Sequence, residues 1–177
     1  GVTDKTSFVD NTAKNNKYWR YSVRSFSFSG YSDFDTNGKY IKYAQTPALT
    51  GISNATNGIY VKWNPVANAS GYRVYRRGAG QTYWTYLGTT DENYFVDASS
   101  AIKADGYYRY TVRSVNSHGF GSFDTNGVLI RYIAPVTGVK ATNAVDGVHI
   151  TWNSYPGANC MVFRLTAGCS EWEYLGQ

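Results

Sequence analysis

The sequence contains few of the residues that cross-link small proteins or cross membranes. Among its 177 residues there are only two cysteines, at positions 160 and 169, and a single methionine. Two cysteines cannot provide the disulfide framework of a small secreted scaffold. No apolar run approaches the roughly 20 residues that cross a bilayer as a helix, so we expect no membrane insertion. Because it has neither an initiator methionine nor a signal peptide, we expect the chain to be a piece of a longer protein.

Charge of one sign is not concentrated in any segment. The 17 basic and 12 acidic side chains give a net charge of +5, and the lysines and arginines alternate with tyrosine and valine. A solvated strand face explains this pattern better than a nucleic-acid groove does. We therefore expect no nucleic-acid partner.

Motifs for catalysis and for metal binding are missing as well. His118 falls in an expected loop and His149 on the outward face of an expected strand, and neither cysteine has a histidine nearby in the sequence. Neither a Gly-x-Ser-x-Gly motif nor a pair of carboxylates in catalytic spacing occurs. The sequence therefore predicts no enzyme, with no catalytic residue, no metal ligand and no cofactor.

One short segment resembles the beginning of a calcium-binding loop. The sequence DFDTNG at 33–38 places oxygen ligands at alternate positions before a glycine. The glutamate that closes such a loop would fall at position 44, which is an alanine, and the second copy at 122–127 begins with a serine. A hairpin turn explains both copies better than a calcium site.

The residues that are abundant are those typical of β-structure. The chain has 17 tyrosines, 8 phenylalanines, 5 tryptophans and 18 glycines. Aromatic side chains suit the half-buried faces of strands, and glycine suits the tight turns between them. No segment shows the periodicity of a helix, so the composition predicts an all-β fold.

Several long segments of the chain occur twice. The sequence YWRYSVRS at 18–25 returns as YYRYTVRS at 107–114, and FDTNG at 34–38 returns at 123–127. Likewise GIYVKWN at 58–64 returns as GVHITWN at 147–153, and WTYLG at 84–88 returns as WEYLG at 172–176. The chain is therefore a tandem array with a period of about 88 residues.

Alternation of apolar and polar residues predicts seven short strands in each repeat. They lie near 49–54, 59–63, 72–77, 83–87, 94–96, 107–115 and 127–133. Seven antiparallel strands joined by turns predict a β-sandwich. The apolar faces of these strands supply the expected core, namely Trp63, Tyr72, Val74, Tyr108, Tyr110, Val112 and Trp152.

Only residues 45–134 make up a whole repeat. Residues 1–44 correspond to its last three strands, and residues 135–177 correspond to its first four. Half a sandwich leaves sheet edges open, so we expect these two halves to complement each other. They could close within one chain or between neighbouring chains, head to tail. A linker of four extended residues spans only about 13 Å, which favours the second arrangement.

The strand motifs resemble those of fibronectin type III domains. Trp63 and Trp152 match the tryptophan that ends the second strand of the family, and GYRV at 71–74 matches its third strand. YRYTVRS at 108–114 matches the sixth strand, whose first tyrosine forms the tyrosine corner, so Tyr108 is the candidate. In the first copy Trp19 stands at this position and has no hydroxyl for that bond. The resemblance implies an immunoglobulin-like sandwich of seven antiparallel strands.

These motifs are also similar to repeats in large secreted and surface proteins of gut Gram-positive bacteria. The resemblance implies an extracellular module, secreted or attached to the cell wall, with a protein-binding or adhesion role. Host proteins, immunoglobulins among them, are then candidate partners. The alternatives are a self-assembling fibre unit, or a spacer or carbohydrate-binding accessory domain of a glycan-degrading enzyme, in which Tyr83, Trp84 and Trp172 would stack on sugars.

The outer face of the sheet made by the third, fourth, sixth and seventh strands is the candidate surface for binding a partner. By alternation six side chains project from it: Arg73, Tyr75, Arg77, Arg109, Arg113 and Arg131. Arginine and tyrosine are enriched at the hot spots of protein interfaces. The alternative is a solvated ladder in which guanidinium groups stack on aromatic rings and stabilise the fold.

The two cysteines fall close together in the last half-repeat. Cys160 takes the place of Tyr72 on the third strand, and Cys169 lies in the turn that follows. The two positions are not directly opposite, so a disulfide would distort the register of the hairpin. We expect Cys160 to be buried and free.

Overall fold

The computed structural model describes residues 1–14, 17–117, 119–154 and 157–177. The chain forms two units, Gly1–Ile133 and Ala134–Gln177. His118, which the sequence assigns to a loop, lies outside the described residues. No helix in the described part of the chain is long and apolar enough to cross a membrane.

The described residues contain the following strands. In the first unit they are β1 (Tyr18–Tyr21), β2 (Phe26–Ser27), β3 (Gly30–Tyr31), β4 (Lys39–Lys42), β5 (Leu49–Ala55), β6 (Gly58–Trp63), β7 (Gly71–Gly78), β8 (Thr85–Thr90), β9 (Tyr94–Asp97), β10 (Tyr107–Asn116), β11 (Gly119–Phe120) and β12 (Val128–Arg131). In the second unit they are β13 (Lys140–Ala144), β14 (Gly147–Thr151), β15 (Val162–Arg164) and β16 (Glu173–Gly176).

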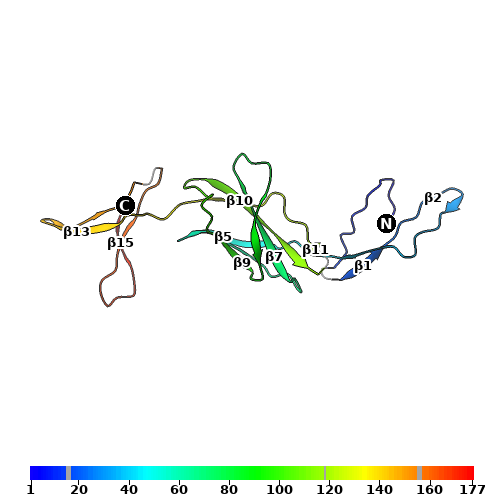
Figure 1. The fold of residues 1–177 in the computed structure, drawn as a ribbon, viewed down its shortest axis with the longest axis horizontal. Helices are drawn as coiled ribbons and strands as arrows, with labels where there is room; N and C mark the ends of the chain where they lie inside the picture. Colours follow the sequence, from blue (N-terminus) through cyan, green and yellow to red (C-terminus); the bar gives the residue numbers. More distant parts are fainter. Residues whose placement is uncertain (15–16, 118, 155–156) are drawn as a thin grey trace. The chain divides into compact units, whose positions relative to one another are not determined.

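Strands β5 to β12 form a sandwich of two antiparallel sheets, drawn in cyan to yellow in Figure 1. The smaller sheet has the order β5-β6-β9. The larger sheet has the order β8-β7-β10, with β12 and the short β11 both paired to β10. Each of the seven strands predicted from the alternation has its counterpart here, and the strand order is that of a fibronectin type III-like sandwich. The predicted fold class is confirmed.

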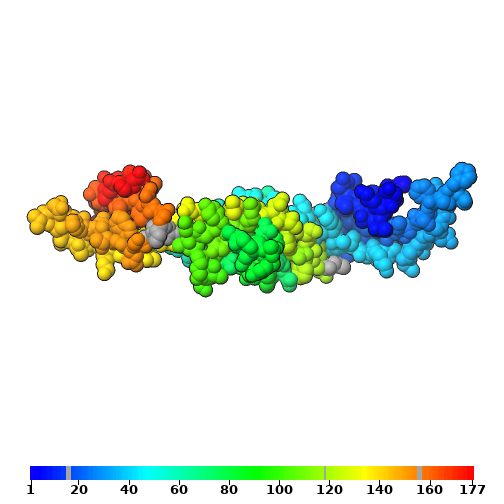
Figure 2. All heavy atoms as spheres, turned by 90° about the horizontal axis from the view of Figure 1, so that it is seen from above, coloured from blue at the N-terminus to red at the C-terminus, as the bar shows by residue number. Residues whose placement is uncertain are grey.

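The core of the sandwich is made of side chains from the facing surfaces of the two sheets. Val74 and Val112 lie directly opposite each other on β7 and β10, and both are fully buried. The Trp63 ring, also fully buried, meets the Tyr72 ring edge-on, with 5.3 Å between the centroids. All six residues that the sequence assigns to this core are buried: Trp63, Tyr72, Val74, Tyr108, Tyr110 and Val112. Figure 2 shows the outer surface of the sandwich, in cyan to yellow.

The tyrosine corner forms in the sandwich, and a tryptophan takes over its role in the first copy. The Tyr108 hydroxyl accepts a hydrogen bond from the backbone N–H of Lys103, at 2.7 Å. At the equivalent positions, the indole N–H of Trp19 donates to the carbonyl oxygen of Lys14, at 3.3 Å. The donor and acceptor are exchanged because an indole has only a donor. A side-chain bond to the same upstream residue therefore closes both corners.

Residues 1–44 reproduce the strand pairing of the last part of the sandwich. Tyr18 lies opposite Lys42 in the β1–β4 pair, as Tyr107 lies opposite Arg131 in the β10–β12 pair. The β2–β3 hairpin has the register of the β10–β11 hairpin. However, β1 has four residues where β10 has ten, because β10 pairs along most of its length with β7 and this segment has no equivalent of β7.

The second unit reproduces the pairing of the first part of the sandwich. The β13–β14 and β15–β16 hairpins have the registers of β5–β6 and β7–β8, including the irregularity between Val162 and Phe163. The core prediction is wrong for Trp152, which is 37% exposed, because the described residues of this unit form only the separate two-stranded sheets β13-β14 and β15-β16, which leave its ring partly uncovered. Cys160 is free, but it precedes β15 and is only half-buried for the same reason.

A buried ion pair joins the two sheets of the sandwich. Alternation along β7 directs Arg76 inward, and its Nη1 lies 2.6 Å from Oδ2 of Asp97 at the end of β9. The Tyr110 hydroxyl donates to the same Oδ2 at 2.7 Å, and the backbone N–H of Ser99 donates to Oδ1 at 3.1 Å. The strand pattern predicts Tyr110 as a core residue, but it does not predict the Arg76 and Asp97 pair.

This network predicts that the sandwich loses stability in alkaline solution. Burial, together with the hydrogen bond to Asp97, raises the pKa of Tyr110 far above its ordinary value. In the unfolded chain Tyr110 loses its proton near pH 10, whereas in the folded chain it keeps it. The unfolded state then binds fewer protons, so the free energy of unfolding should fall by up to about 1.4 kcal/mol per pH unit above about pH 10. Urea unfolding across this range measures the slope, and Tyr110→Phe should flatten it. An equal slope in this variant would contradict the assignment.

Candidate functional site

The outer face of the larger sheet carries two arginine pairs that face each other across neighbouring strands. Arg73 lies opposite Arg113, and Arg77 lies opposite Arg109, on the outward side of β7 and β10. Like charges directly opposite each other destabilise a sheet, so both pairs require compensation. The two pairs are compensated differently, and this difference defines the site.

The Arg73 and Arg113 pair is embedded in aromatic rings. The Arg73 guanidinium lies 3.8 Å from the centroid of Phe120, and that of Arg113 lies 5.1 Å from the same ring. Arg113 also donates from Nε to the carbonyl oxygen of Gly121, at 2.7 Å. The Tyr75 ring packs on that of Phe123, at 5.2 Å. Arg73, Tyr75 and Arg113 therefore form the stabilising ladder that the sequence analysis raised as the alternative to a binding site.

Arg131 is compensated by a carboxylate. It forms an ion pair and a hydrogen bond with Asp105, and its guanidinium lies 6.0 Å from the centroid of the Tyr107 ring. Both charged side chains are more than one-third exposed, so this pair contributes little to stability. Arg131 lies on the predicted face, but its charge is already neutralised within the chain.

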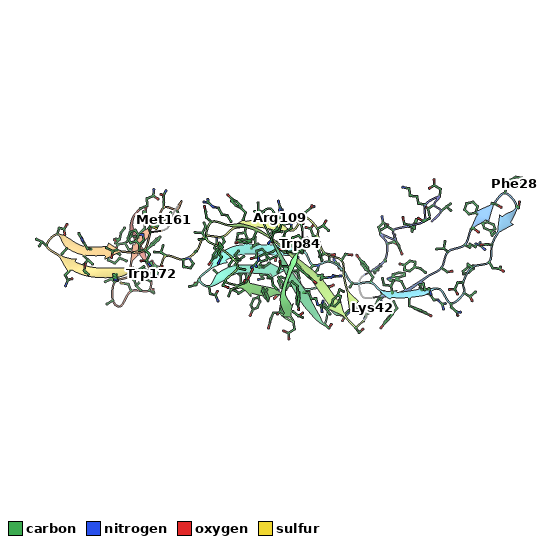
Figure 3. All side chains as sticks on the ribbon, turned by 45° about the horizontal axis from the view of Figure 1, so that its top comes forward. Phe28, Lys42, Trp84, Arg109, Met161 and Trp172 are labelled. Atoms are coloured by element: carbon green, nitrogen blue, oxygen red, sulfur yellow. The ribbon has the colours of Figure 1, made fainter. Side chains whose placement is uncertain are left out.

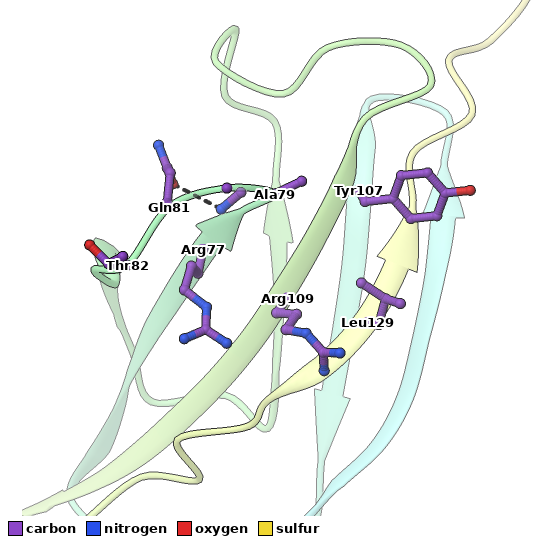
Figure 4. A pocket seen from close by; sticks show the side chains of 9 residues that line it. Arg77, Ala79, Gln81, Thr82, Tyr107, Arg109 and Leu129 are labelled. Atoms are coloured by element: carbon purple, nitrogen blue, oxygen red, sulfur yellow. Dashed lines mark hydrogen bonds between the residues drawn. The ribbon is translucent and has the colours of Figure 1, made fainter.

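The Arg77 and Arg109 pair lines a groove at one end of the face (Figure 4). The groove runs between the turn at 78–82 and strand β12, and Tyr107 and Leu129 provide its apolar wall. The Arg77 guanidinium lies 4.7 Å from the centroid of Trp84. Arg109 donates from Nη1 to the carbonyl oxygens of Asn126 and Gly127, at 3.3 and 3.2 Å. The chain's own contacts therefore hold both guanidinium groups in place.

The groove carries positive charge that its surroundings do not neutralise. Among the described residues, no carboxylate lies within 4.0 Å of the guanidinium nitrogens of Arg77 or Arg109. Carbonyl oxygens and a ring face engage these groups without cancelling their charge. Such a groove suits a partner that presents a carboxylate beside an apolar side chain, since guanidinium pairs well with carboxylate.

The turn at 78–82 and the segment at 119–127, which contains β11, shape this face, and the strand pattern alone did not predict their contribution. Gln81 accepts a hydrogen bond from the Gly78 N–H through Oε1, at 2.9 Å, which fixes the turn. Phe120 on β11 and Phe123 in the loop after it cover the sheet. The sequence did contain a signal for this packing, because aromatic residues recur at the equivalent positions of the first copy, Tyr31 and Phe34. There Arg24, the equivalent of Arg113, stacks on both rings.

Trp84 is not the exposed ring that the sequence analysis predicted for sugar stacking. Arg77 covers it, and it meets the Phe123 ring edge-on at 5.9 Å. Tyr83 and Trp172 are exposed, at 63% and 66%. Figure 3 shows Trp84 and Arg109 on the sandwich and Trp172 on the hairpins of the second unit. A platform of three rings is therefore not available.

The two DTNG segments form turns in which the aspartate bonds to the backbone. Asp124 accepts from the N–H of Asn126 at 2.8 Å, and Asp35 accepts from the N–H of Asn37 at 2.9 Å. The glycines that follow have positive φ angles, 63° at Gly127 and 57° at Gly38. These contacts account for the aspartates as turn residues. The described residues contain no group of three histidines, cysteines, aspartates or glutamates that could hold a metal ion.

Comparison with protein families and with curated proteins finds no match to this sequence. Solved structures do match. An Fn3-like protein from Clostridium thermocellum has 19% identity and a TM-score of 0.43, over 51% of this chain and 95% of the other. The FN1–FN3 domains of chicken CNTN1 have 15% identity and a TM-score of 0.48, over 92% of this chain and 63% of the other.

A third similar structure is a beta-1,2-glucanase from Parabacteroides distasonis, with 16% identity and a TM-score of 0.43. The match covers 58% of this chain but only 15% of the glucanase. These likenesses concern the fold alone. What makes the chain a fibronectin type III-like sandwich is its own strand order, with β5-β6-β9 packed against β8-β7-β10-β12.

Proposed function

We propose that the chain is a non-catalytic module of an extracellular protein and that it binds other proteins through the groove of Arg77 and Arg109. The observation that carries this proposal is the pair of facing guanidinium groups without a carboxylate partner in the described part of the chain. Tyr107 and Leu129 beside them are each 49% exposed and offer apolar contact. Arginine and tyrosine in one patch are typical of interface hot spots.

The similarity of the strand motifs to repeats of bacterial surface proteins supports a bacterial source, and we propose a gut Gram-positive bacterium. The parent protein would be secreted or attached to the cell wall. A partner of such a protein is a host extracellular protein, and we propose immunoglobulin as the first to be tested. The groove selects among such partners by charge, because an acidic side chain on the partner would neutralise the two arginines.

Charge reversal in the groove tests this function. We expect Arg109→Glu and Arg77→Glu each to weaken binding of the chain to immobilised immunoglobulin at least about tenfold, because each variant places like charge against the partner. Interferometry with purified immunoglobulin measures the effect. Pull-downs from serum and mucosal secretions extend the test to other host proteins. They compare what the two variants and the unchanged chain retain.

Lys62→Glu is the matched control, because it makes the same change in net charge on the exposed side of β6 in the other sheet. Equal loss with this variant would point to unspecific attraction by the positive chain. Unchanged binding with both arginine variants would remove the groove from consideration.

The second candidate is a spacer or carbohydrate-binding accessory domain. The observation in its favour is the exposure of the Tyr83 and Trp172 rings. Single exposed rings stack weakly on sugars, and Trp84 is covered, so we place this function second. A glycan array with the folded chain separates the two functions, since binding there that survives Arg109→Glu would favour the carbohydrate role.

A further inference from the structure

The groove on the outer face of the sandwich has three different surfaces across its width (Figure 4). The turn at 78–82 forms one side, the guanidinium groups of Arg77 and Arg109 lie in the middle, and Tyr107 and Leu129 form the apolar side. A ligand that fills the groove must therefore bring a polar edge, a negative charge and an apolar surface within one compact unit.

The two guanidinium groups are held side by side by the chain itself. Arg77 and Arg109 lie opposite each other on β7 and β10, and Figure 4 shows both side chains extending toward the same end of the groove. The Trp84 ring packs on the first, and the carbonyl oxygens of Asn126 and Gly127 accept from the second. One carboxylate between them can accept from both, because each of its two oxygens is an acceptor. Side chains that are already ordered lose little entropy on binding.

The groove is larger than the carboxylate of one acidic side chain. Its volume is about 520 Å³, within the range of roughly 300–1,000 Å³ that is typical of sites for small ligands. An aspartate or glutamate of a protein would bring the charge alone, and other residues would then have to fill the two sides. A small ligand that carries its own polar and apolar surfaces fits this space better.

The turn side of the groove presents backbone and hydroxyl groups. Gly78, Ala79 and Gly80 have a small side chain or none, and a Cβ at Gly80 would meet nothing within 4 Å. The peptide groups at the tip of this turn are therefore accessible. Thr82 adds a hydroxyl, which can both donate and accept. Groups of this kind form hydrogen bonds with the neutral hydroxyls of a ligand.

A sugar acid combines all three features on one ring, because it has a carboxylate, several hydroxyls and an apolar C–H face. We propose that the groove binds such a sugar, the terminal sialic acid of a glycan on the partner protein. Its carboxylate lies between Arg77 and Arg109, its hydroxyls face the turn at 78–82, and its C–H face covers Tyr107 and Leu129, which are each 49% exposed. This inference rests on the proposed function, since it names the group of the partner that the groove recognises.

The distribution of charge on this face favours a single terminal acid over a polymer of acidic sugars. A polymer repeats its charge along the chain and matches a row of accessible cations. Here Phe120 packs on the guanidinium groups of Arg73 and Arg113 and restricts access to them, and Asp105 neutralises Arg131. The charge that a ligand can reach is therefore concentrated in the groove, which matches one carboxylate at the end of a glycan.

An NMR titration of the full chain with sialyllactose tests the site, and lactose is the matched ligand without the acid. We expect sialyllactose to shift the backbone signals of residues 77–82 and 127–130, and lactose at the same concentration to leave them in place. Arg77→Lys and Arg109→Lys should each weaken binding at least about tenfold, since lysine keeps the charge but lacks the planar set of donors. Arg73→Lys makes the same change outside the groove and should bind sialyllactose like the unchanged chain. No shift at millimolar sialyllactose, or equal shifts with lactose, would overturn the proposal.

Sialidase treatment of immobilised immunoglobulin separates this inference from the proposed function. We expect removal of sialic acid to weaken binding of the chain at least about tenfold, because the groove then loses the charge that it recognises. Binding that survives the treatment but is lost with Arg109→Glu would overturn the sugar acid and keep the protein-binding groove. Binding that is lost on treatment but unchanged in both arginine variants would place the sugar elsewhere and overturn the site. A short peptide with glutamate beside leucine that binds more tightly than sialyllactose would also overturn the sugar acid.

Discussion

Replacing Asp97 by alanine should lower the free energy of unfolding of the sandwich by about 3–5 kcal/mol, because the guanidinium of Arg76 would remain buried without its partner. Arg76 and Asp97 are 8% and 2% exposed, so water cannot replace the lost carboxylate. The Tyr110 hydroxyl and the Ser99 N–H lose their acceptor at the same time. Small domains are stable by only about 5–15 kcal/mol, so Asp97→Ala removes a large part of the total.

Urea unfolding followed by the indole NMR signal of Trp63 measures this change, because that side chain lies fully buried within the same sandwich. Asp10→Ala is the matched control. It removes the equivalent carboxylate from a half-buried site outside the sandwich, and the Trp63 transition should not move. The double variant Arg76→Met with Asp97→Leu should recover much of the loss, since apolar residues often replace a buried ion pair without penalty. A change below about 1 kcal/mol for Asp97→Ala would contradict the buried pair.

The sequence predicted the elements of the sandwich well because its core strands alternate cleanly. Tyr72 and Val74 on β7, and Tyr110 and Val112 on β10, are apolar at every second position, and this period can place the side chains of a strand without knowledge of the partner strand. The same alternation directs Arg76 inward. The burial of Arg76 was not predicted, because a charged residue is buried only with a partner. That partner, Asp97, lies on the other sheet, and the pattern of β7 alone does not indicate it.

The packing on the outer face of the larger sheet was predicted less completely, for a physical reason. Alternation correctly gives the side of the sheet from which Arg73, Arg77 and Arg109 project, but it does not show what covers that side. Phe120 on the short β11 and Phe123 in the loop after it decide which arginines are packed and which line the groove, and the path of this segment does not follow from strand periodicity. Similarly, the motif around Trp152 predicts a core position, but burial there depends on strands that its own unit lacks.

Replacing Gly58 by alanine should cost about 2–6 kcal/mol, which is comparable with the loss of the buried ion pair. Gly58 begins β6 with φ at 151°, a conformation that L-residues rarely adopt. A Cβ at this position would lie against the carbonyl group of Asp97, with its carbon only 2.8 Å away. Because Ile59 pairs with Asp97, relief of this collision would separate β9 from β6 and displace the carboxylate that Arg76 requires.

Gly147→Ala separates the two contributions to this cost. Gly147 begins β14 with φ at 142°, so the variant introduces the same backbone strain, but its Cβ has no neighbour within 4 Å. Hydrogen exchange measures the effect of each variant at its own site. The amides that pair β6 with β9 report on Gly58→Ala, and those that pair β13 with β14 report on Gly147→Ala. Strain alone predicts equal loss of protection in both pairs of strands. The contact with Asp97 predicts a larger loss in the sandwich. There the collision also breaks the pairing of β6 with β9, and this pairing positions the buried carboxylate.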